Sequence, residues 1–155
     1  MSYATIDDMQ ARYVPDDLIA ITDPTNQAID LARLQGALDD ASAEIDGYLG
    51  VRYLLPLVDA DIGTPIASPQ LLVRACCDIA AYSLQTMRPR DDVEDVRRRY
   101  ESWQRMLRLL SKGDVQINAK LLAGQATFPA DVSQSVGETL ITSVRHADTF
   151  GRRNR

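Results

Sequence analysis

The chain has 155 residues, 45% hydrophobic and 25% charged, values typical of one globular domain that folds without disulfides or a structural metal. No apolar run approaches the roughly 20 residues that cross a bilayer, the N-terminal stretch MSYATIDDMQ is too acidic for a secretory signal, and the adjacent Cys76 and Cys77 suggest a reducing compartment. Charge is uneven along the chain. Residues 1–61 carry 12 acidic and 3 basic residues, a net charge of −9, and residues 62–155 carry 10 acidic and 14 basic residues, a net charge of +4. The chain can therefore attract its own copies, meet partners of either sign, or carry two solvated faces.

The pattern of caps and apolar spacing predicts helices along most of the first 112 residues. Thr5, with an acidic Asp8 three positions later, is a suitable start for the first of them. Gly50 is a plausible C-cap of a long helix. Ser68 followed by Pro69 is a strong helix start, because serine caps and proline suits the first helical position. The expected helical segments are 6–13, 15–22, 27–49, 69–86 and one from just after Asp91 or Asp92 to Lys112.

Two segments are predicted to be irregular. Residues 51–67, with two prolines and a glycine, indicate an ordered loop, and the character of the chain changes again after Gly113. In the last part, VQIN at 115–118 and TLITSV at 139–144 are predicted to pair as strands because β-branched residues favour them. The expected fold is mainly α: a four- to five-helix bundle over 1–113 and an extended, partly β C-terminal arm over 114–155 that becomes ordered on a partner. Apolar residues expected to make the arm's contacts include Phe128, Leu140, Ile141 and Phe150.

Four carboxylates lie close together within the expected helix 27–49: Asp39, Asp40, Glu44 and Asp46. At about 100° per residue they spread around the side opposite the apolar stripe, which contains Leu34, Ala37, Leu38, Ala41, Ile45, Tyr48 and Leu49. A metal site needs ligands that meet at a point, and a hydrolase pair needs two carboxyls that face one cleft. We therefore interpret the four acids as a side of the helix that faces water or a partner.

The last predicted helix carries a basic stripe next to its apolar stripe. The apolar positions are Val93, Val96, Tyr100, Trp103, Leu107 and Leu110, and the basic positions are Arg97, Arg98, Arg105, Arg108 and Lys112. Three interpretations remain open: the stripe is solvated, binds phosphate, or meets the acidic side of helix 27–49 in another copy. The helix 69–86 has its own apolar stripe, in which Cys76 is expected to be in the core, whereas Cys77 is about 100° further round the helix. The residues of this stripe are Leu71, Leu72, Ala75, Cys76, Ile79 and Tyr82.

Groups that usually perform catalysis are scarce. His146 is the only histidine and lies in the expected arm. No glycine-rich phosphate loop, nucleophile elbow or Cys/His metal spacing is present in the sequence. We expect a protein without enzymatic activity, cofactor or bound metal.

The linear order of several stretches resembles the Mu-like phage family of small head–tail connector proteins, also called head-completion or adaptor proteins. The resemblance covers about residues 2–118, and the arm matches only loosely. The stretches that carry it are YATIDDMQARY, LQGALDDASAEIDGYLGVRYLLPL, LLVRACCDIAAYSL and YESWQRMLRLLSKGDVQI.

Membership in this family would imply a small helical bundle at the head–tail interface of the virion, assembled in the cytoplasm of a host bacterium. It would form a homo-oligomeric ring, usually twelvefold, below the portal protein. The ring would extend the channel through which genomic DNA passes without sequence-specific binding. The side of helix 27–49 that carries Asp39, Asp40, Glu44 and Asp46 would then face this channel or a neighbouring subunit. It would also offer a surface to a tail terminator or other tail-completion protein.

Two rival functions are distinguishable from this one. A nucleic-acid-binding module would use Arg97, Arg98, Arg105 and Arg108, and its DNA affinity would fall steeply with salt. A small hydrolase would use the four carboxylates and would bind a divalent metal.

Overall fold

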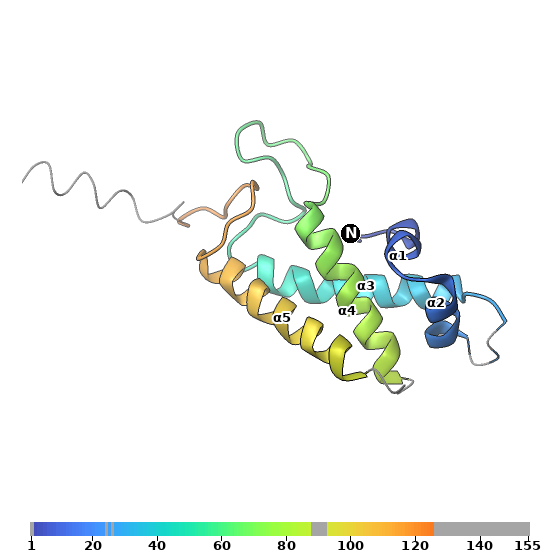
Figure 1. Ribbon diagram of the computed structural model, residues 1–155. Helices are drawn as coiled ribbons and strands as arrows, with labels where there is room; N and C mark the ends of the chain where they lie inside the picture. Colours follow the sequence, from blue (N-terminus) through green and yellow to red (C-terminus); the bar gives the residue numbers. More distant parts are fainter. Residues whose placement is uncertain (1, 24, 26, 88–92, 126–155) are drawn as a thin grey trace, which may run out of the picture. The chain divides into compact units, whose positions relative to one another are not determined.

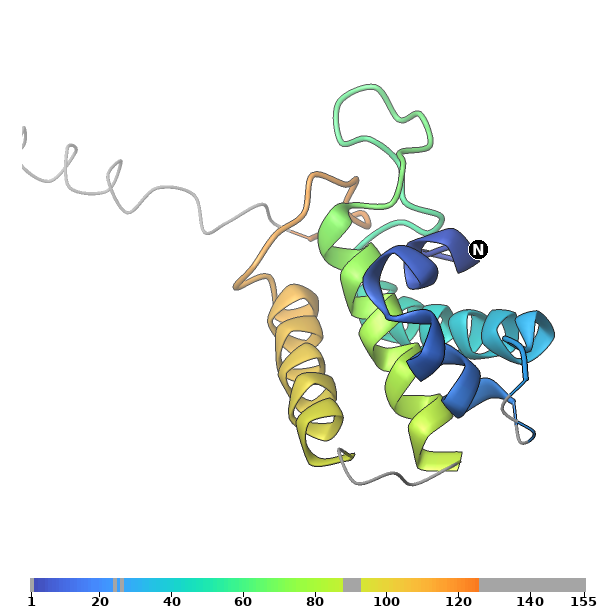
Figure 2. The same ribbon diagram turned by 45° about the vertical axis from the view of Figure 1, so that its right-hand side comes forward.

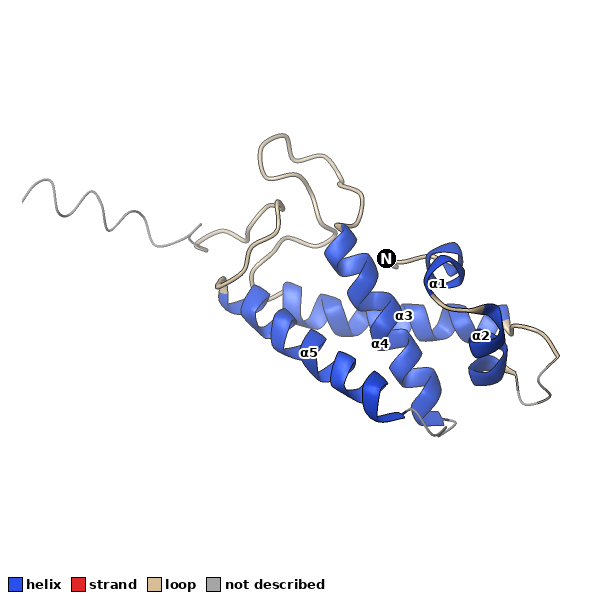
Figure 3. Cartoon of the chain, viewed as in Figure 1, coloured by secondary structure: helices blue, strands red, loops and turns tan. Residues whose placement is uncertain are grey.

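The computed structural model describes residues 2–23, 25, 27–87 and 93–125, and these belong to one compact unit. Figure 1 traces this unit, and Figure 3 shows that its regular structure is helical, with no strand in the described ranges. The predicted mainly α fold is therefore confirmed. No helix in this part of the chain is both long and apolar enough to cross a bilayer. The helices are α1 (Ile6–Arg12), α2 (Pro15–Thr22), α3 (Leu31–Leu49), α4 (Gln70–Met87) and α5 (Val93–Lys112).

Local capping explains where the first helices begin. Thr5 Oγ1 accepts a hydrogen bond from the Asp8 backbone N–H at 3.2 Å, and the Asp8 carboxylate accepts one from Thr5 N–H at 2.9 Å, as the sequence predicted. The expected start of the long helix at residue 27 is wrong. The helix begins at Leu31 because the Asp30 side chain caps it by accepting from Arg33 N–H at 3.0 Å.

Helix α4 is the centre of the bundle. It contacts each of the other four helices, and Figure 2 shows it between α5 on one side and α1 and α2 on the other. The predicted stripe on this helix was too narrow, because Cys77 is fully buried together with Cys76. A central helix surrounded by neighbours is apolar on nearly all sides, so a one-sided pattern underestimates its burial. Its buried residues are Leu72, Val73, Ala75, Cys76, Cys77, Asp78, Ile79, Ala80, Ala81 and Leu84.

The apolar stripes of α3 and α5 complete the core as the sequence predicted. On α3 every predicted residue is buried except Tyr48, which is half-buried. On α5, Val96, Leu107 and Leu110 are buried, and the Tyr100 ring stacks on Tyr82 of α4 with 4.3 Å between ring centroids. Such a stack adds to the burial energy that holds α5 against α4.

The C-terminus of α5 ends at a glycine that lies against the side chain of Arg52. Gly113 has a φ of +90°, a left-handed conformation that glycine adopts without steric cost. A Cβ atom there would lie 2.5 Å from the guanidinium of Arg52, which is itself buried. This position is favourable for a cation, because the last carbonyl groups of a helix carry partial negative charge.

After Gly113 the chain turns back along the loop 51–67 (Figure 1). Leu54 N–H donates to Lys120 C=O at 2.9 Å, Leu122 N–H to Arg52 C=O at 2.8 Å, and Lys120 N–H to Val58 C=O at 2.9 Å. The loop is thus ordered, as predicted, by hydrogen bonds to residues 114–125 and by others within the loop itself. The strand predicted at 115–118 is wrong: this stretch forms no ladder, and Ile117 N–H donates to the side-chain oxygen Tyr53 Oη at 3.3 Å. The predicted partner strand at 139–144 lies outside the described residues.

Candidate interaction surfaces

The four carboxylates of α3 do not converge, as their spacing predicted. Asp39 and Asp40 are exposed, and Asp39 accepts a hydrogen bond from Gln35 of the same helix at 3.0 Å. Glu44 and Asp46 are partly buried and point to different neighbours. Among the residues with a described position, no group of three or more His, Cys, Asp or Glu side chains could hold a metal ion.

Glu44 is part of the contact between α3 and α5. Its carboxylate accepts hydrogen bonds from Tyr100 Oη at 3.0 Å and from Gln104 Nε2 at 3.5 Å. Burial, followed by the hydrogen bond to Glu44, raises the pKa of Tyr100 to about 12. This carboxylate therefore links α3 to α5 and is not a freely solvated acid.

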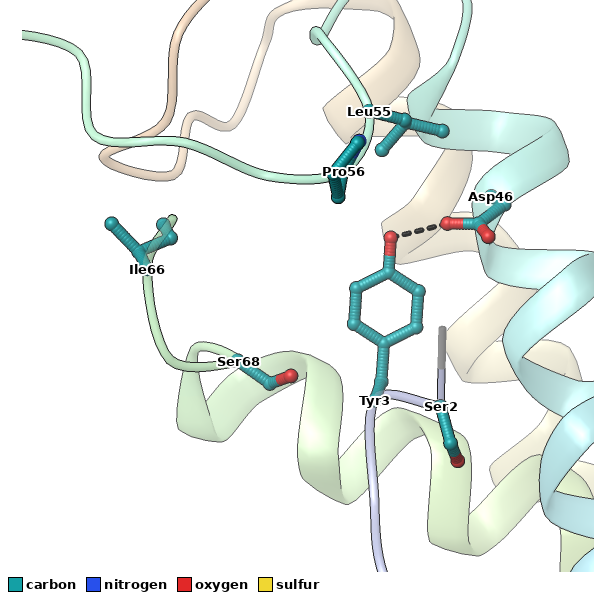
Figure 4. Close-up of a pocket in the computed structure, with 7 residues that line it drawn as sticks. All are labelled: Ser2, Tyr3, Asp46, Leu55, Pro56, Ile66 and Ser68. Carbon is teal, nitrogen blue, oxygen red and sulfur yellow. Dashed lines mark hydrogen bonds between the residues drawn. The ribbon is translucent and has the colours of Figure 1, made fainter. Parts of the chain in front are cut away.

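Asp46 lines a pocket on the other side of α3. Tyr3 Oη donates a hydrogen bond to Asp46 Oδ1, and burial together with that bond raises the pKa of the tyrosine. Figure 4 shows the Tyr3 ring standing between Asp46 and the loop residues Pro56 and Ile66. The pocket has a volume of about 350 Å³ and is lined by Ser2, Tyr3, Asp46, Leu55, Pro56, Ile66 and Ser68.

The basic stripe of α5 divides into two halves. In the first half, Arg97 forms an ion pair with Glu101 at 3.0 Å, and Arg98 lies 3.6 Å from Glu94 and 3.8 Å from Asp95. These exposed pairs neutralise charge locally but add little stability.

In the second half of α5, Arg105, Arg108 and Lys112 are exposed, and none forms an ion pair with another described residue. Arg105 Nε makes only a long hydrogen bond, 3.4 Å, to the backbone carbonyl of Glu101. The positive charge available to a partner is therefore concentrated in the C-terminal half.

The tip of the loop 51–67 presents an apolar side chain on an ordered base. The Asp59 carboxylate accepts hydrogen bonds from the N–H groups of Asp61 at 2.8 Å and Ile62 at 3.1 Å. Asp59 N–H donates to Thr64 C=O at 2.7 Å, and Gly63 adopts a φ of +68° to complete the turn. Ile62 remains 76% exposed. An isoleucine held outward by a fixed turn loses little conformational entropy when a partner covers it.

A buried carboxylate on α4 is a residue that sequence reasoning missed. Asp78 accepts hydrogen bonds from Tyr13 Oη at 2.6 Å and Trp103 Nε1 at 2.7 Å, and Arg74 Nε lies 4.0 Å away. The acid thus joins the α1–α2 junction and α5 to the central helix. Burial and the bond to Asp78 raise the pKa of Tyr13. The available signal was one aspartate within the apolar run ACCDIAAY, where a charge requires partners.

The expected arm contacts Phe128, Leu140, Ile141 and Phe150 lie outside the described residues, so their role stays a prediction.

Residues 3–135 match the family described as Bacteriophage Mu, Gp36. The chain belongs to the bacteriophage Mu Gp36 family. It is 36% identical to gene product J of Escherichia phage Mu over 110 residues, and this alignment covers 70% of this chain and 72% of that protein. It is 39% identical to the Mu-like prophage FluMu protein gp36 of Haemophilus influenzae over 94 residues, and this alignment covers 61% of this chain and 59% of that relative. The predicted Mu-like phage family is confirmed.

The match to the Mu Gp36 family spans α1 to α5, the loop 51–67 and residues 114–125. The loop tip, the exposed half of α5 and, apart from Ser2, the pocket beside Tyr3 lie within this range. These surfaces are therefore features of the part of the chain that defines it as a Mu Gp36 protein.

Proposed function

We propose that this chain is a structural head–tail connector of a tailed, Mu-like phage and has no catalytic activity. In this proposal a homo-oligomeric ring, with the twelvefold order usual for a portal, lies below the portal protein and extends the DNA channel. Its other side receives a tail terminator or tail-completion protein. The protein would then be found at the head–tail interface of the virion.

The observation that carries this proposal, once membership in a phage family is established, is the ordered loop 51–67. Its tip holds Ile62 76% exposed on a turn fixed by the Asp59 carboxylate and by Gly63. An apolar side chain held outward by a fixed turn is suited to contact another protein, because little conformational entropy is lost when a partner covers it. A protein whose job is to join two assemblies needs such surfaces and needs no cleft for chemistry.

The arrangement of the carboxylates also supports a structural role. Glu44, Asp46 and Asp78 each accept a hydrogen bond from a tyrosine of the same chain, and two of them connect helices. The rival function as a nucleic-acid-binding module is weakened, because Arg97 and Arg98 already pair with acids on their own helix. DNA affinity that falls steeply with salt would restore that rival.

Imaging of assembled particles tests the proposal. Heads made with this protein are expected to carry a ring at the portal vertex, and heads made without it are expected to leak DNA or remain tailless. Normally tailed particles in the absence of the protein, or a vertex without a ring, would refute the connector function.

A further inference from the structure

The exposed C-terminal half of α5 is a cationic face without a partner in the described unit. Arg105, Arg108 and Lys112 are separated by three and four positions, so they lie along one side of the helix. Leu109 lies beside them and is 38% exposed. Glu101 is the last acid on α5, so no carboxylate of this helix reduces the charge beyond that turn.

The exposed face of α3 has the opposite character. It carries Asp39 and Asp40, both exposed, while Arg33, one or two turns earlier, forms an ion pair with Asp30 at 3.9 Å. Figure 1 shows α4 crossing one side of α3; this acidic face lies opposite the buried stripe, so it remains open in the described unit.

The same face of α3 is sterically smooth. Gly36 and Gly47 are exposed, and beyond the adjoining residues and backbone of α3 a Cβ at either position would meet nothing within 4 Å. Ala32 and Ala43 lie on this face and are also exposed. Glycine in a helix interior is destabilising relative to alanine, and here the packing of the described unit gives no reason for it. Small side chains let a second helix approach closely, because interaxial distance depends on the side chains at the contact.

We propose that the Arg105–Lys112 face of α5 binds the Asp39–Asp40 face of α3 on a second copy of this chain. The cations meet the two aspartates, and Leu109 packs on the smooth surface beside them. The contact is heterologous, because it joins two different surfaces of the same chain. In an open row of copies, one acidic face and one basic face would stay unpaired at the two ends. A closed ring pairs these two faces with each other. The inference rests on the proposed ring and names the surfaces through which its subunits meet.

Charge reversal provides the test, because two broken variants can repair each other. One variant is Asp39→Arg/Asp40→Arg, in which both faces are basic. The other is Arg105→Asp/Arg108→Asp, in which both faces are acidic. All four positions are exposed, so the melting temperature and helix content of each variant should match those of the original chain.

Each purified full-length variant is added to heads that lack this protein, and ring formation is scored by particle imaging and by the amount of chain bound per head. Each variant alone is expected to bind at least about tenfold less than the original chain, because like charges across an interface repel. An equal mixture is expected to restore binding, because every contact then joins an acidic face to a basic one. A matched control is Arg97→Gln/Arg98→Gln, which removes two self-paired cations and should leave binding unchanged.

The outcomes separate this inference from the proposed function. If the original chain forms no ring, the connector function fails and the inference fails with it. If the original chain forms a ring and either reversed variant alone forms it equally well, the connector function stands and the α3–α5 contact is refuted. A mixture that stays as inactive as its components also refutes the pairing.

Discussion

Replacing Tyr13 with phenylalanine is the sharpest test of how the bundle is held together. The change removes a hydrogen bond of 2.6 Å to the Asp78 carboxylate and leaves the ring in place. A hydrogen bond to a charged group contributes about 1.5–3 kcal/mol to the free energy of unfolding. At roughly 3–4 °C per kcal/mol for a unit of this size, the melting temperature should fall by about 5–12 °C.

The assay is thermal and urea unfolding followed by circular dichroism, with Tyr82→Phe as the matched control. The Tyr82 ring stacks on Tyr100, and its hydroxyl has no hydrogen bond to another described residue, so this control should change stability by less than about 0.5 kcal/mol. In a double-mutant cycle with Asp78→Asn, the effect of Tyr13→Phe should shrink by about 1 kcal/mol or more, because the two residues share one bond. A Tyr13→Phe protein as stable as the Tyr82→Phe control would refute the view that Asp78 joins the α1–α2 junction to α4.

Three further outcomes are expected. Gly113→Ala should lower the free energy of unfolding by about 2 kcal/mol or more, since a Cβ there combines an unfavourable φ with a clash against Arg52. Gly124→Ala, which has a similar φ of +89° and no neighbour, should cost only about 1 kcal/mol, and equal melting temperatures for the two variants would contradict the role of Arg52. Burial, and after it the neighbouring Cys76 thiol, raises the pKa of Cys77 from 9.0 to about 12. The folded state therefore holds this proton more tightly than the unfolded state. The contribution of Cys77 to the free energy of unfolding should be full below pH 9 and decline as the pH approaches 12. Urea unfolding across this range should show a smaller decline for Cys77→Ala, and an unchanged slope would count against the assignment. Ile62→Asp should leave the melting temperature unchanged and reduce tailed particles in a plating and imaging assay, whereas Ile62→Leu should support normal particles; a fully active Ile62→Asp protein would remove the loop tip from the interface.

The sequence predicted helix identity and the apolar faces of α3 and α5 well, because these depend on periodicity within one segment. It missed the start of α3, which begins at Leu31, four residues after the expected position, because Asp30 provides the cap. It also underestimated the burial of α4, since Cys77 lies outside any single stripe but is covered by helices that the sequence cannot position.

The candidate surfaces were less predictable than the fold. Spacing correctly indicated that the four carboxylates of α3 do not converge. It could not indicate that Glu44 and Asp46 are taken by Tyr100 and Tyr3, because those contacts span 56 and 43 residues of chain. The division of the basic stripe, by contrast, follows from local spacing, because Arg97 has Glu101 one turn later on its helix and Arg105 has no acid there.

The bonds between residues 114–125 and the loop 51–67 give this protein a path for mechanical force. Tension applied to the chain beyond Gln125 reaches Lys120, whose backbone N–H and C=O groups are bonded to Val58 and Leu54. Val58 lies at the base of the turn that carries Ile62, so a pull on the following segment is transmitted to the tip of the loop. The position of Ile62 is therefore mechanically coupled to residues 114–125 through a few backbone hydrogen bonds.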